Sequence, residues 1–262
     1  MTRTLPFYQV DAFTSRVFAG NPAGVCPLDD WLPDETMQAI AAENYLPETA
    51  FFVPDGEGYG IRWFTPEVEI DLAGHPTLAT AFVLFNELGV EKDAVSFGTK
   101  LGDRLTVRRD GDLLSMDFPA RPADPTDRLG DVAGALGAEP REVLAARDGM
   151  AVFDSEAEVR ALRPDMAKVA AMDVLGLIAT APGDACDFVS RFFAPRAGIP
   201  EDPVTGSTHC TLTPYWASRL NKPKLQARQI SPRGGELEVA LNGDRVAIAG
   251  QAALYLKGEI YV

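Results

Sequence analysis

The chain has 262 residues, of which 46% are hydrophobic, and a formal net charge of −14 at pH 7. This length suits one large domain or two of ordinary size, and this hydrophobic content is enough to build globular cores. A strongly acidic balance without a cluster of Lys or Arg argues against nucleic acid or an anionic membrane as a partner, so neither is predicted.

The cysteines and the N-terminal segment indicate a cellular compartment. No run of about 18 uninterrupted apolar residues is present to span a bilayer, and the N-terminal segment lacks the apolar stretch of a secretory signal. Cys26, Cys186 and Cys210 have no metal-binding or redox spacing. Because an odd number of cysteines suits a reducing compartment, we expect a cytoplasmic protein.

Alternating apolar residues in the first part of the chain predict strands at 7–13, 50–53, 60–64, 94–97, 104–108 and 113–118. A turn-rich loop is expected over 18–24, and a helix over 34–43 with Asp34 as a candidate cap. The almost wholly apolar segment that follows 73–76 (AGHP) predicts a buried helix ending at Gly89. Proline is favoured in a first helical turn and glycine just beyond the last one.

Glu48 directly precedes the strand predicted at 50–53. A carboxylate in such a place is commonly a solvated charge at the edge of a sheet, unless other residues place it in a cleft.

Residues 119–131 are rich in Pro and Asp and are predicted to be the crossing between two halves. Beyond them the patterns predict short helical pieces at 131–136, 140–144, 156–162 and 165–171, and strands at 150–153, 174–181, 187–193, 236–241, 245–250 and 252–261. Residues 201–221 are read as a polar loop that leads into a buried helix, with a cap within 205–207. Pro214 is expected to kink or break that helix before Tyr215.

The two buried helices lie inside a longer repeat. The segments 62–66 (RWFTP) and 191–195 (RFFAP) precede them, and similar Gly-acid motifs followed by Leu and Val begin at Gly102 and Gly235. These motifs lie 28 residues beyond Gly74 and 29 beyond Gly206. The repeat predicts a duplicated unit of strand, loop, buried helix and further strands.

The residues also predict a type of chemistry. His75 and His209 are the only histidines, and no Gly-rich phosphate loop or Schiff-base lysine context is present, so neither a metal nor a cofactor is predicted. His75 stands beside a glycine at a helix start and is the better site candidate, whereas His209 is expected to be mainly structural. If Glu48 and Asp202 share a cleft with His75, charge and burial would separate their protonation preferences, so that one group takes a proton and another gives it.

The two helix starts predict the type of ligand. The first backbone N–H groups of a helix have no intrahelical acceptor, and each helix start carries a partial charge of roughly +0.5. We therefore expect Gly74 and Gly206 to admit a small carboxylate-bearing substrate to these N–H groups, with the Ser207 hydroxyl as a further donor.

The segments YQVDAFTSRVFAGNPAGV, Glu48-Thr49, AGHPTLATA and GIPEDPVTGSTHCTLTPYWA together resemble the PhzF-like family of phenazine-biosynthesis-type isomerases. The similarity spans nearly the whole chain in the same order. It implies an α+β fold like that of diaminopimelate epimerase, with two pseudo-symmetric halves that are each a barrel-like mixed sheet wrapped around a central helix. The expected halves are residues 1–118 with 250–262, and residues 119–249. A site in the cleft between them and a homodimer are also implied.

The resemblance also implies roles for individual residues. Glu48 would be the catalytic acid or base, with His75 and Asp202 beside it, and Gly74, Gly206 and Ser207 would bind substrate. The related racemases and epimerases use a pair of cysteines, whereas this chain has Ala73 and Pro203 in the corresponding neighbourhoods.

Three functions follow from these observations. The first is a cofactor-independent isomerase that shifts a proton, and with it a double bond, in a small carboxylated metabolite. The second is an epimerase or racemase of an amino or hydroxy acid, which requires a second base opposite Glu48. The third is a ligand-binding relative without catalytic activity.

Overall fold

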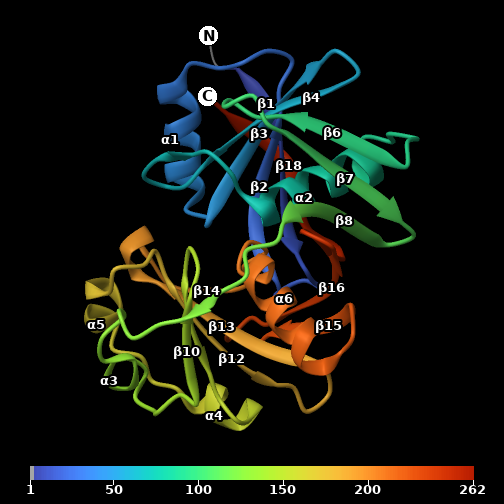
Figure 1. Ribbon diagram of the computed structural model, residues 1–262. Helices are drawn as coiled ribbons and strands as arrows, with labels where there is room; N and C mark the ends of the chain where they lie inside the picture. The colour runs from blue at the N-terminus through green and yellow to red at the C-terminus, as the bar shows by residue number, and fades with distance from the viewer. Residues whose placement is uncertain (1–2) are drawn as a thin grey trace. The chain divides into compact units, whose positions relative to one another are not determined.

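The computed structural model describes residues 3–262, which divide into two compact units (Figure 1). One unit comprises the residues up to Asp117 together with Ala249–Val262, and the other comprises Phe118–Ile248. Each unit consists of a mixed β-sheet, one largely buried α-helix and further helical segments, so the predicted α+β class is confirmed. No helix among the described residues is long and apolar enough to cross a membrane.

The sheet of the first unit runs in the order β18, β1, β2, β3, β4, β6, β7, β8. Only the β2–β3 and β4–β6 pairs are parallel, and β5 adds to β4 as a short antiparallel partner. Helices α1 and α2 form the two crossovers that parallel pairs require. The bounds are β1 Thr4–Ala12, β2 Asn21–Pro27, α1 Asp34–Asn44, β3 Glu48–Asp55, β4 Gly58–Phe64, β5 Glu69–Ile70, α2 Gly74–Phe82, β6 Ala94–Gly98, β7 Arg104–Asp110, β8 Leu113–Pro119 and β18 Ala252–Tyr261.

Helix α2 packs against β1, β2, β3, β7 and β18, and its residues 75–81 are all buried. Its two threonines satisfy their hydroxyls locally, because Thr77 Oγ1 donates to the Ala73 carbonyl at 2.6 Å and Thr80 Oγ1 to the Pro76 carbonyl at 2.7 Å. One π-helical turn, η1 at Val83–Glu87, continues the helix. The chain then reaches Gly89 with a φ of 68°, so the predicted helix end is confirmed.

The second unit repeats these pairings. Its strands run β9, β10, β11, β12, β13, β15, β16, with β11–β12 and β13–β15 parallel, and with short β14 antiparallel to β13. The same directions occur in the same order in the first unit, as a duplicated chain requires. The bounds are β9 Asp124–Pro125, α3 Val132–Leu136, β10 Glu142–Ala145, β11 Gly149–Val152, α4 Glu156–Ala161, α5 Met166–Ala171, β12 Leu177–Pro182, β13 Phe188–Ala194, η2 Pro195–Ala197, β14 Ile199–Asp202, α6 His209–Leu220, β15 Lys224–Gln229, β16 Gly235–Asn242 and β17 Arg245–Gly250.

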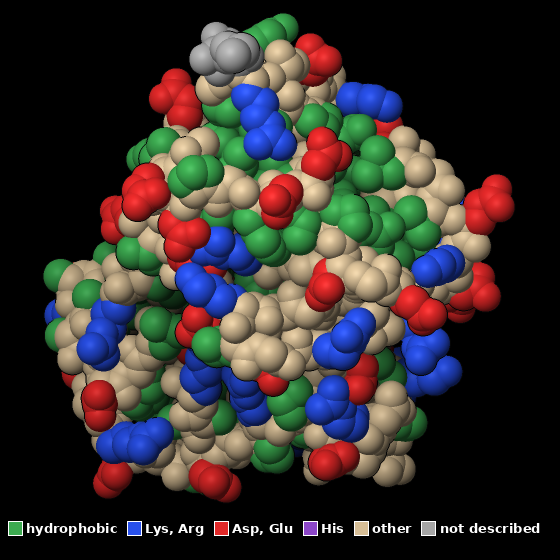
Figure 2. Space-filling model, turned by 90° about the horizontal axis from the view of Figure 1, so that it is seen from above, with side chains coloured by type: hydrophobic (Ala, Val, Ile, Leu, Met, Phe, Trp, Pro, Cys, Tyr) green, Lys and Arg blue, Asp and Glu red, His purple; other side chains and the backbone are tan. Residues whose placement is uncertain are grey.

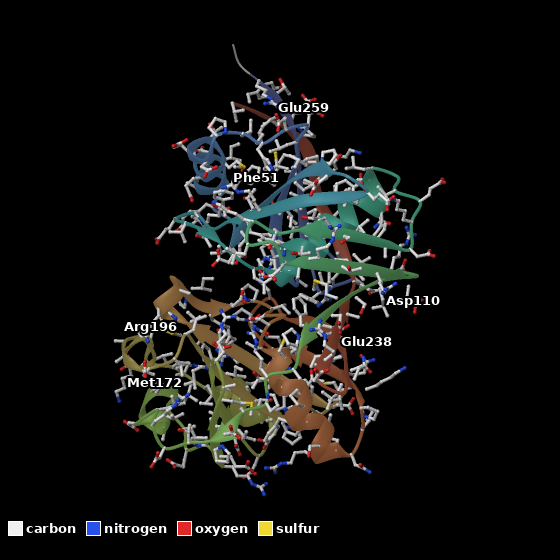
Figure 3. All side chains as sticks on the ribbon, turned by 45° about the horizontal axis from the view of Figure 1, so that its top comes forward. Phe51, Asp110, Met172, Arg196, Glu238 and Glu259 are labelled. Atoms are coloured by element: carbon white, nitrogen blue, oxygen red, sulfur yellow. The ribbon has the colours of Figure 1, made fainter. Side chains whose placement is uncertain are left out.

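The three short helices of the second unit begin at side-chain caps. Asp131, Ser155 and Asp165 each accept a hydrogen bond from a backbone N–H in the first turn of α3, α4 and α5. Within η2, Arg196 Nη1 donates to the carbonyl of Met172 at 2.9 Å, and these two residues lie close together in Figure 3. Caps and carbonyl contacts of this kind allow helices of five or six residues to persist.

One ion pair occurs in both units at the same place in the repeat. Arg62 on β4 donates to both carboxylate oxygens of Glu69 at 2.7 and 2.8 Å, and Arg191 on β13 does the same to Glu201 at 2.7 and 2.9 Å. Each guanidinium also lies over the aromatic ring two residues further along its strand. The pair ties β5 to β4 and β14 to β13, directly before each buried helix.

Helix α6 differs from the prediction at its start and at its proline. It begins at His209 with Thr208 as N-cap, because 206–208 form a separate turn. It continues through Pro214 to Leu220 and is not broken. Proline has no N–H to donate to the Cys210 carbonyl, but the backbone N–H of Arg121 donates to that carbonyl at 2.8 Å. The lost helical bond is therefore replaced from the segment that follows β8.

Three smaller predictions are wrong. Residues 21–24 belong to β2, so the turn-rich loop ends earlier than predicted. Residues 142–145 form β10 because they pair with β11, and a short apolar run does not distinguish a strand from a helix. Asp34 does not cap α1, where Pro33 is the N-cap, and instead pairs with Arg62 Nη1 at 2.8 Å.

The repeated ion pair predicts a loss of stability in both units when its arginine is replaced. Arg191→Met should lower the free energy of unfolding by about 2–4 kcal/mol, because the partly buried Glu201 carboxylate loses its bidentate partner. Arg62→Met should cost less than this but more than the control, because Lys100 Nζ still lies 2.8 Å from Glu69 Oε2. Arg104→Met, at an exposed position of β7, is the control and should cost less than about 0.5 kcal/mol. Urea unfolding of the three variants gives the comparison, and a cost near the control's for either arginine would show that the pair does not stabilise its unit.

Candidate active-site residues

Glu48 is buried in the first unit. It is the first residue of β3, pairs in register with Ala23 of β2, and is 9% exposed. The interpretation of Glu48 as a solvated edge charge is therefore wrong, because the parallel pairing with β2 covers this end of β3. A carboxylate buried to this extent requires a compensating partner nearby.

His75 supplies that partner from the start of α2. Its Nε2 atom lies 3.1 Å from Glu48 Oε2, and its Nδ1 atom lies 3.3 Å from Asn21 Nδ2. The Nε2–Oε2 pair is within ion-pair distance, although its alignment does not meet the geometry of a hydrogen bond. Glu48 Oε2 accepts no hydrogen bond from the residues that the structure describes. The cluster thus contains a buried carboxylate oxygen that retains capacity to accept a proton or a donor.

Gly74 adjoins this cluster as the first residue of α2. Ala73, at the N-cap, has no side chain that could cap the helix. A Cβ at Gly74 would meet only Met116 Cε, at 3.9 Å, and Gly74 does not have a positive φ. Neither packing within residues 3–262 nor backbone conformation requires glycine here. Its absence of a side chain instead keeps the start of a buried helix open to a ligand.

Asp202, Gly206 and Ser207 lie together in the second unit. Asp202 ends β14, is 8% exposed, and accepts a hydrogen bond from the hydroxyl of Thr205. Gly206 and Ser207 lie in the turn before α6, where their carbonyls accept from His209 N at 3.0 Å and Cys210 N at 3.2 Å. No acceptor for the backbone N–H of Gly206 or Ser207 is found within residues 3–262. These N–H groups therefore have the properties of an anion site.

Gln229 holds this turn in place, and the sequence reasoning missed it. Its Nε2 donates to the Asp202 carbonyl at 2.7 Å and to Thr205 Oγ1 at 3.1 Å, and its Oε1 accepts from Thr205 N at 2.9 Å. A signal was present in the sequence: Leu225, Ala227 and Gln229 share the buried face of β15, so a polar residue ends an otherwise apolar alternation.

His209 is fully buried in the second unit. Its Nδ1 donates to the Thr205 carbonyl at 2.9 Å, and burial lowers its pKa from 6.5 to about 4. The imidazole is therefore neutral at physiological pH. Figure 2 shows acidic and basic side chains interspersed on one face of the molecule, and no histidine is visible there.

Two of the three cysteine thiols are buried and protonated. Burial raises the pKa of Cys26 to about 12 and that of Cys210 to about 11, so neither is a thiolate at neutral pH. In the part of the chain that the structure describes, no three His, Cys, Asp or Glu side chains are grouped so as to hold a metal ion.

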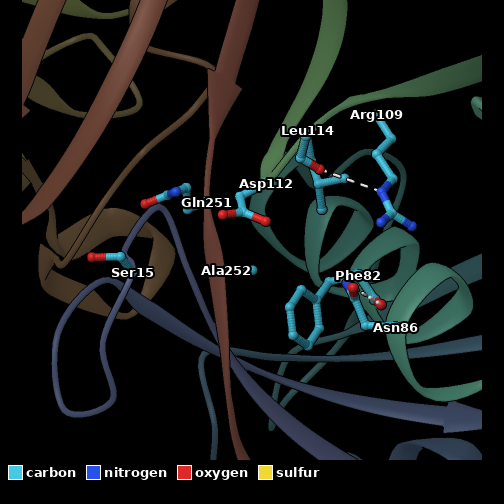
Figure 4. Close-up of a pocket in the computed structure, with 9 residues that line it drawn as sticks. Ser15, Phe82, Asn86, Arg109, Asp112, Leu114, Gln251 and Ala252 are labelled. Carbon is cyan, nitrogen blue, oxygen red and sulfur yellow. Dashed lines mark hydrogen bonds between the residues drawn. The ribbon is translucent and has the colours of Figure 1, made fainter.

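A separate cavity in the first unit contains none of the predicted site residues. It has a volume of about 150 Å³ and lies between the β7–β8 turn, the end of α2 with its π-helical turn, and the start of β18 (Figure 4). Its lining consists of Ser15, Phe82, Asn86, Arg109, Gly111, Asp112, Leu114, Gln251 and Ala252. The Glu48 cluster is therefore distinct from this cavity.

Known proteins match the chain over nearly its whole length. The family model described as phenazine biosynthesis-like protein matches residues 10–258. An uncharacterized isomerase of Pseudomonas aeruginosa is 49% identical over 258 residues, which cover 98% of this chain and 99% of the relative. A crystal structure of a PhzF-family phenazine biosynthesis protein from Enterococcus faecalis has a TM-score of 0.97 and 47% identity, and the match covers 99% of this chain and 100% of that chain.

A more distant structure shows how far the fold extends. A hydroxyproline epimerase from Agrobacterium vitis has a TM-score of 0.62 at 12% identity, with 99% of this chain and 93% of that chain covered. At this identity the likeness concerns the fold alone.

The Gln229 contacts predict a loss of stability on substitution. Gln229→Leu leaves the Thr205 N–H and the Asp202 carbonyl buried without their partner, and should lower the free energy of unfolding by about 2–4 kcal/mol. Gln226→Leu on the exposed face of the same strand is the control, with an expected change within about 0.5 kcal/mol. If urea unfolding gives the two variants equal stability, the side chain of Gln229 does not hold the turn.

The lowered pKa of His209 predicts a pH dependence. Because the folded pKa of about 4 lies below the ordinary 6.5, the unfolded chain binds this proton more tightly. The contribution of neutral His209 is fully present above pH 6.5 and is lost as the pH falls toward 4. It amounts to about 3 kcal/mol at 1.36 kcal/mol per pKa unit.

His209→Asn keeps a donor near the Nδ1 position and removes this titration. The stability difference between wild type and His209→Asn should therefore shrink as the pH is lowered from neutral to mildly acidic values. A difference that stays constant in pH-resolved unfolding curves would contradict a neutral buried imidazole.

Proposed function

We propose, since this chain belongs to the phenazine biosynthesis-like protein family, that it is an isomerase that shifts a proton, and with it a double bond, in a small carboxylated metabolite. The proposal depends most on one observation. Glu48 Oε2 is buried, accepts no hydrogen bond from residues 3–262, and lies 3.1 Å from a histidine at the start of a buried helix. Such a group is suited to take a proton from carbon and return it at another carbon.

In the proposed reaction Glu48 removes a proton from the substrate and returns it to a different carbon. General acid–base catalysis by a positioned side chain supplies roughly 10²–10⁴-fold. Negative charge that develops as the C–H bond breaks needs further stabilisation, which the helix start at Gly74 and a ring N–H of His75 can provide. Proton movement of this kind requires no cofactor, and none is proposed.

The residues of the second unit enter the proposal through the family resemblance. The backbone N–H groups of Gly206 and Ser207, with the Ser207 hydroxyl, would hold the substrate carboxylate. Asp202 would face the reacting part of the substrate, where its fixed carboxylate orients a hydroxyl or amine. That these residues and Glu48 serve one substrate remains a prediction, as do the predicted division into halves, the homodimer and the cytoplasmic location.

The epimerase alternative requires a second base opposite Glu48. The corresponding neighbourhoods hold Ala73 and Pro203, and burial raises the pKa of Cys210 to about 11. A protonated thiol is a poor base at neutral pH. The isomerase proposal needs only one group that carries the proton, and we therefore favour it.

A screen of cyclic and acyclic carboxylic acids in deuterium oxide tests the proposal. NMR or mass spectrometry should detect a substrate whose isomerised product carries deuterium at carbon, or whose own carbon-bound proton exchanges. Inversion of a single stereocentre without movement of a double bond would instead support the epimerase alternative. Absence of exchange and conversion across unsaturated carboxylic acids, amino acids and hydroxy acids would contradict both enzymatic functions.

With a substrate identified, Glu48→Gln should lower the exchange rate by at least about 100-fold, because the amide keeps the shape but has no ionisable group. Binding, measured by calorimetry, should be largely preserved. Glu43→Gln, at an exposed position of α1, is the matched control and should retain wild-type activity. Turnover retained by Glu48→Gln would remove Glu48 from the mechanism.

A further inference from the structure

Asn21 is delivered into the core of the first unit by a sharp turn. It begins β2 opposite Ala12 of β1 and is 0% exposed. Gly20, directly before it, has a φ of 65°, and a Cβ there would collide with the Ala12 carbonyl oxygen. Only glycine permits this turn, which brings Asn21 to a fully buried position beside the His75 ring.

The His75 ring lies between Asn21 and Glu48. The amide Nδ2 of Asn21 is 3.3 Å from Nδ1, and the carboxylate oxygen Oε2 of Glu48 is 3.1 Å from Nε2. An amide nitrogen is a donor only, and a carboxylate oxygen is an acceptor only. Nδ1 must therefore accept, and Nε2 must carry the proton, for both contacts to be favourable.

The other protonation states conflict with these neighbours. A proton on Nδ1 would place two N–H donors face to face and would turn the Nε2 lone pair toward the Glu48 carboxylate. A rotated Asn21 amide would remove the first conflict but leave the second. A doubly protonated ring would again oppose the amide N–H, and its charge would lie at the positive end of the α2 dipole.

We infer that Asn21 fixes His75 as the neutral tautomer with its proton on Nε2, and so keeps a single N–H directed to the Glu48 side of the ring. Asn21 is thus a positioning residue that acts through His75, and this role rests on the proposed function. This tautomer gives the two groups of the cluster different roles. Glu48 is the group that takes the proton, and His75 is a neutral donor to negative charge. A neutral histidine at a helix N-terminus is suited to that task.

His209 provides an internal reference for the inference. Its Nδ1–H donates to the Thr205 carbonyl at 2.9 Å, so it holds the opposite tautomer. The chain has only two histidines, so ¹⁵N-histidine labelling gives two sets of ring signals. Long-range ¹H–¹⁵N correlation spectra identify the protonated nitrogen of each ring directly.

The experiment compares wild type with two variants at neutral pH, without substrate. Wild type should show one ring protonated on Nε2 and one on Nδ1. In Glu48→Gln the Nε2–H tautomer of His75 should persist, because Asn21 still donates to Nδ1. In Asn21→Asp the side chain keeps its shape but presents only acceptors, so the proton should move to Nδ1 or both nitrogens should be protonated. The signals of His209 in the second unit should be unchanged throughout, and a circular dichroism spectrum and a cooperative unfolding transition like those of the wild type report that each variant is folded.

Several outcomes would overturn the inference. They are a wild-type His75 protonated on Nδ1, a change of tautomer in Glu48→Gln, or an unchanged Nε2–H tautomer in a folded Asn21→Asp. If Asn21→Asp does not fold, the wild-type and Glu48→Gln spectra still decide. The readout needs no turnover, so an inactive protein with the expected tautomers contradicts only the proposed function, and an active one with the wrong tautomer contradicts only this inference.

Discussion

A buried helix start must find acceptors for its first N–H groups without help from bulk water, and both units of this protein leave that need without a side-chain cap. Helix α2 begins after Ala73, and α6 begins after a turn in which Gly206 and Ser207 keep their N–H groups available. Each start lies near a buried carboxylate, Glu48 in one unit and Asp202 in the other. Open donors beside a buried acid are costly for stability and useful for binding an anion.

The two units treat their carboxylates differently. Asp202 is held by Thr205, and Gln229 fixes the turn around it through three hydrogen bonds. Glu48 has one oxygen that accepts no hydrogen bond from residues 3–262, and its contact with His75 is not aligned as a hydrogen bond. A duplicated scaffold has thus produced one rigid carboxylate, suited to orienting a substrate, and one with spare capacity, suited to moving a proton.

Features set by local residues, such as proline, glycine and short repeated motifs, could be predicted from the sequence. Proline and glycine place the limits of the α2 segment, and the repeated Arg-x-Phe motifs predict the duplication that the strand pairings display. Features that depend on partners far apart in the sequence could not be predicted in this way. Glu48 is buried by pairing with β2, and α6 survives Pro214 because the N–H of Arg121 replaces the missing donor. The roles of Asn21 and Gln229 depend likewise on residues far along the chain.

The central claim is that the carboxylate of Glu48 meets the reacting carbon of the substrate. A crystal structure of Glu48→Gln soaked with a substrate found in the deuterium screen tests it most directly. The account predicts that the amide of residue 48 lies roughly 3–3.5 Å from the carbon that loses or gains the proton. A substrate bound with that carbon against another ionisable group, and away from residue 48, would contradict it.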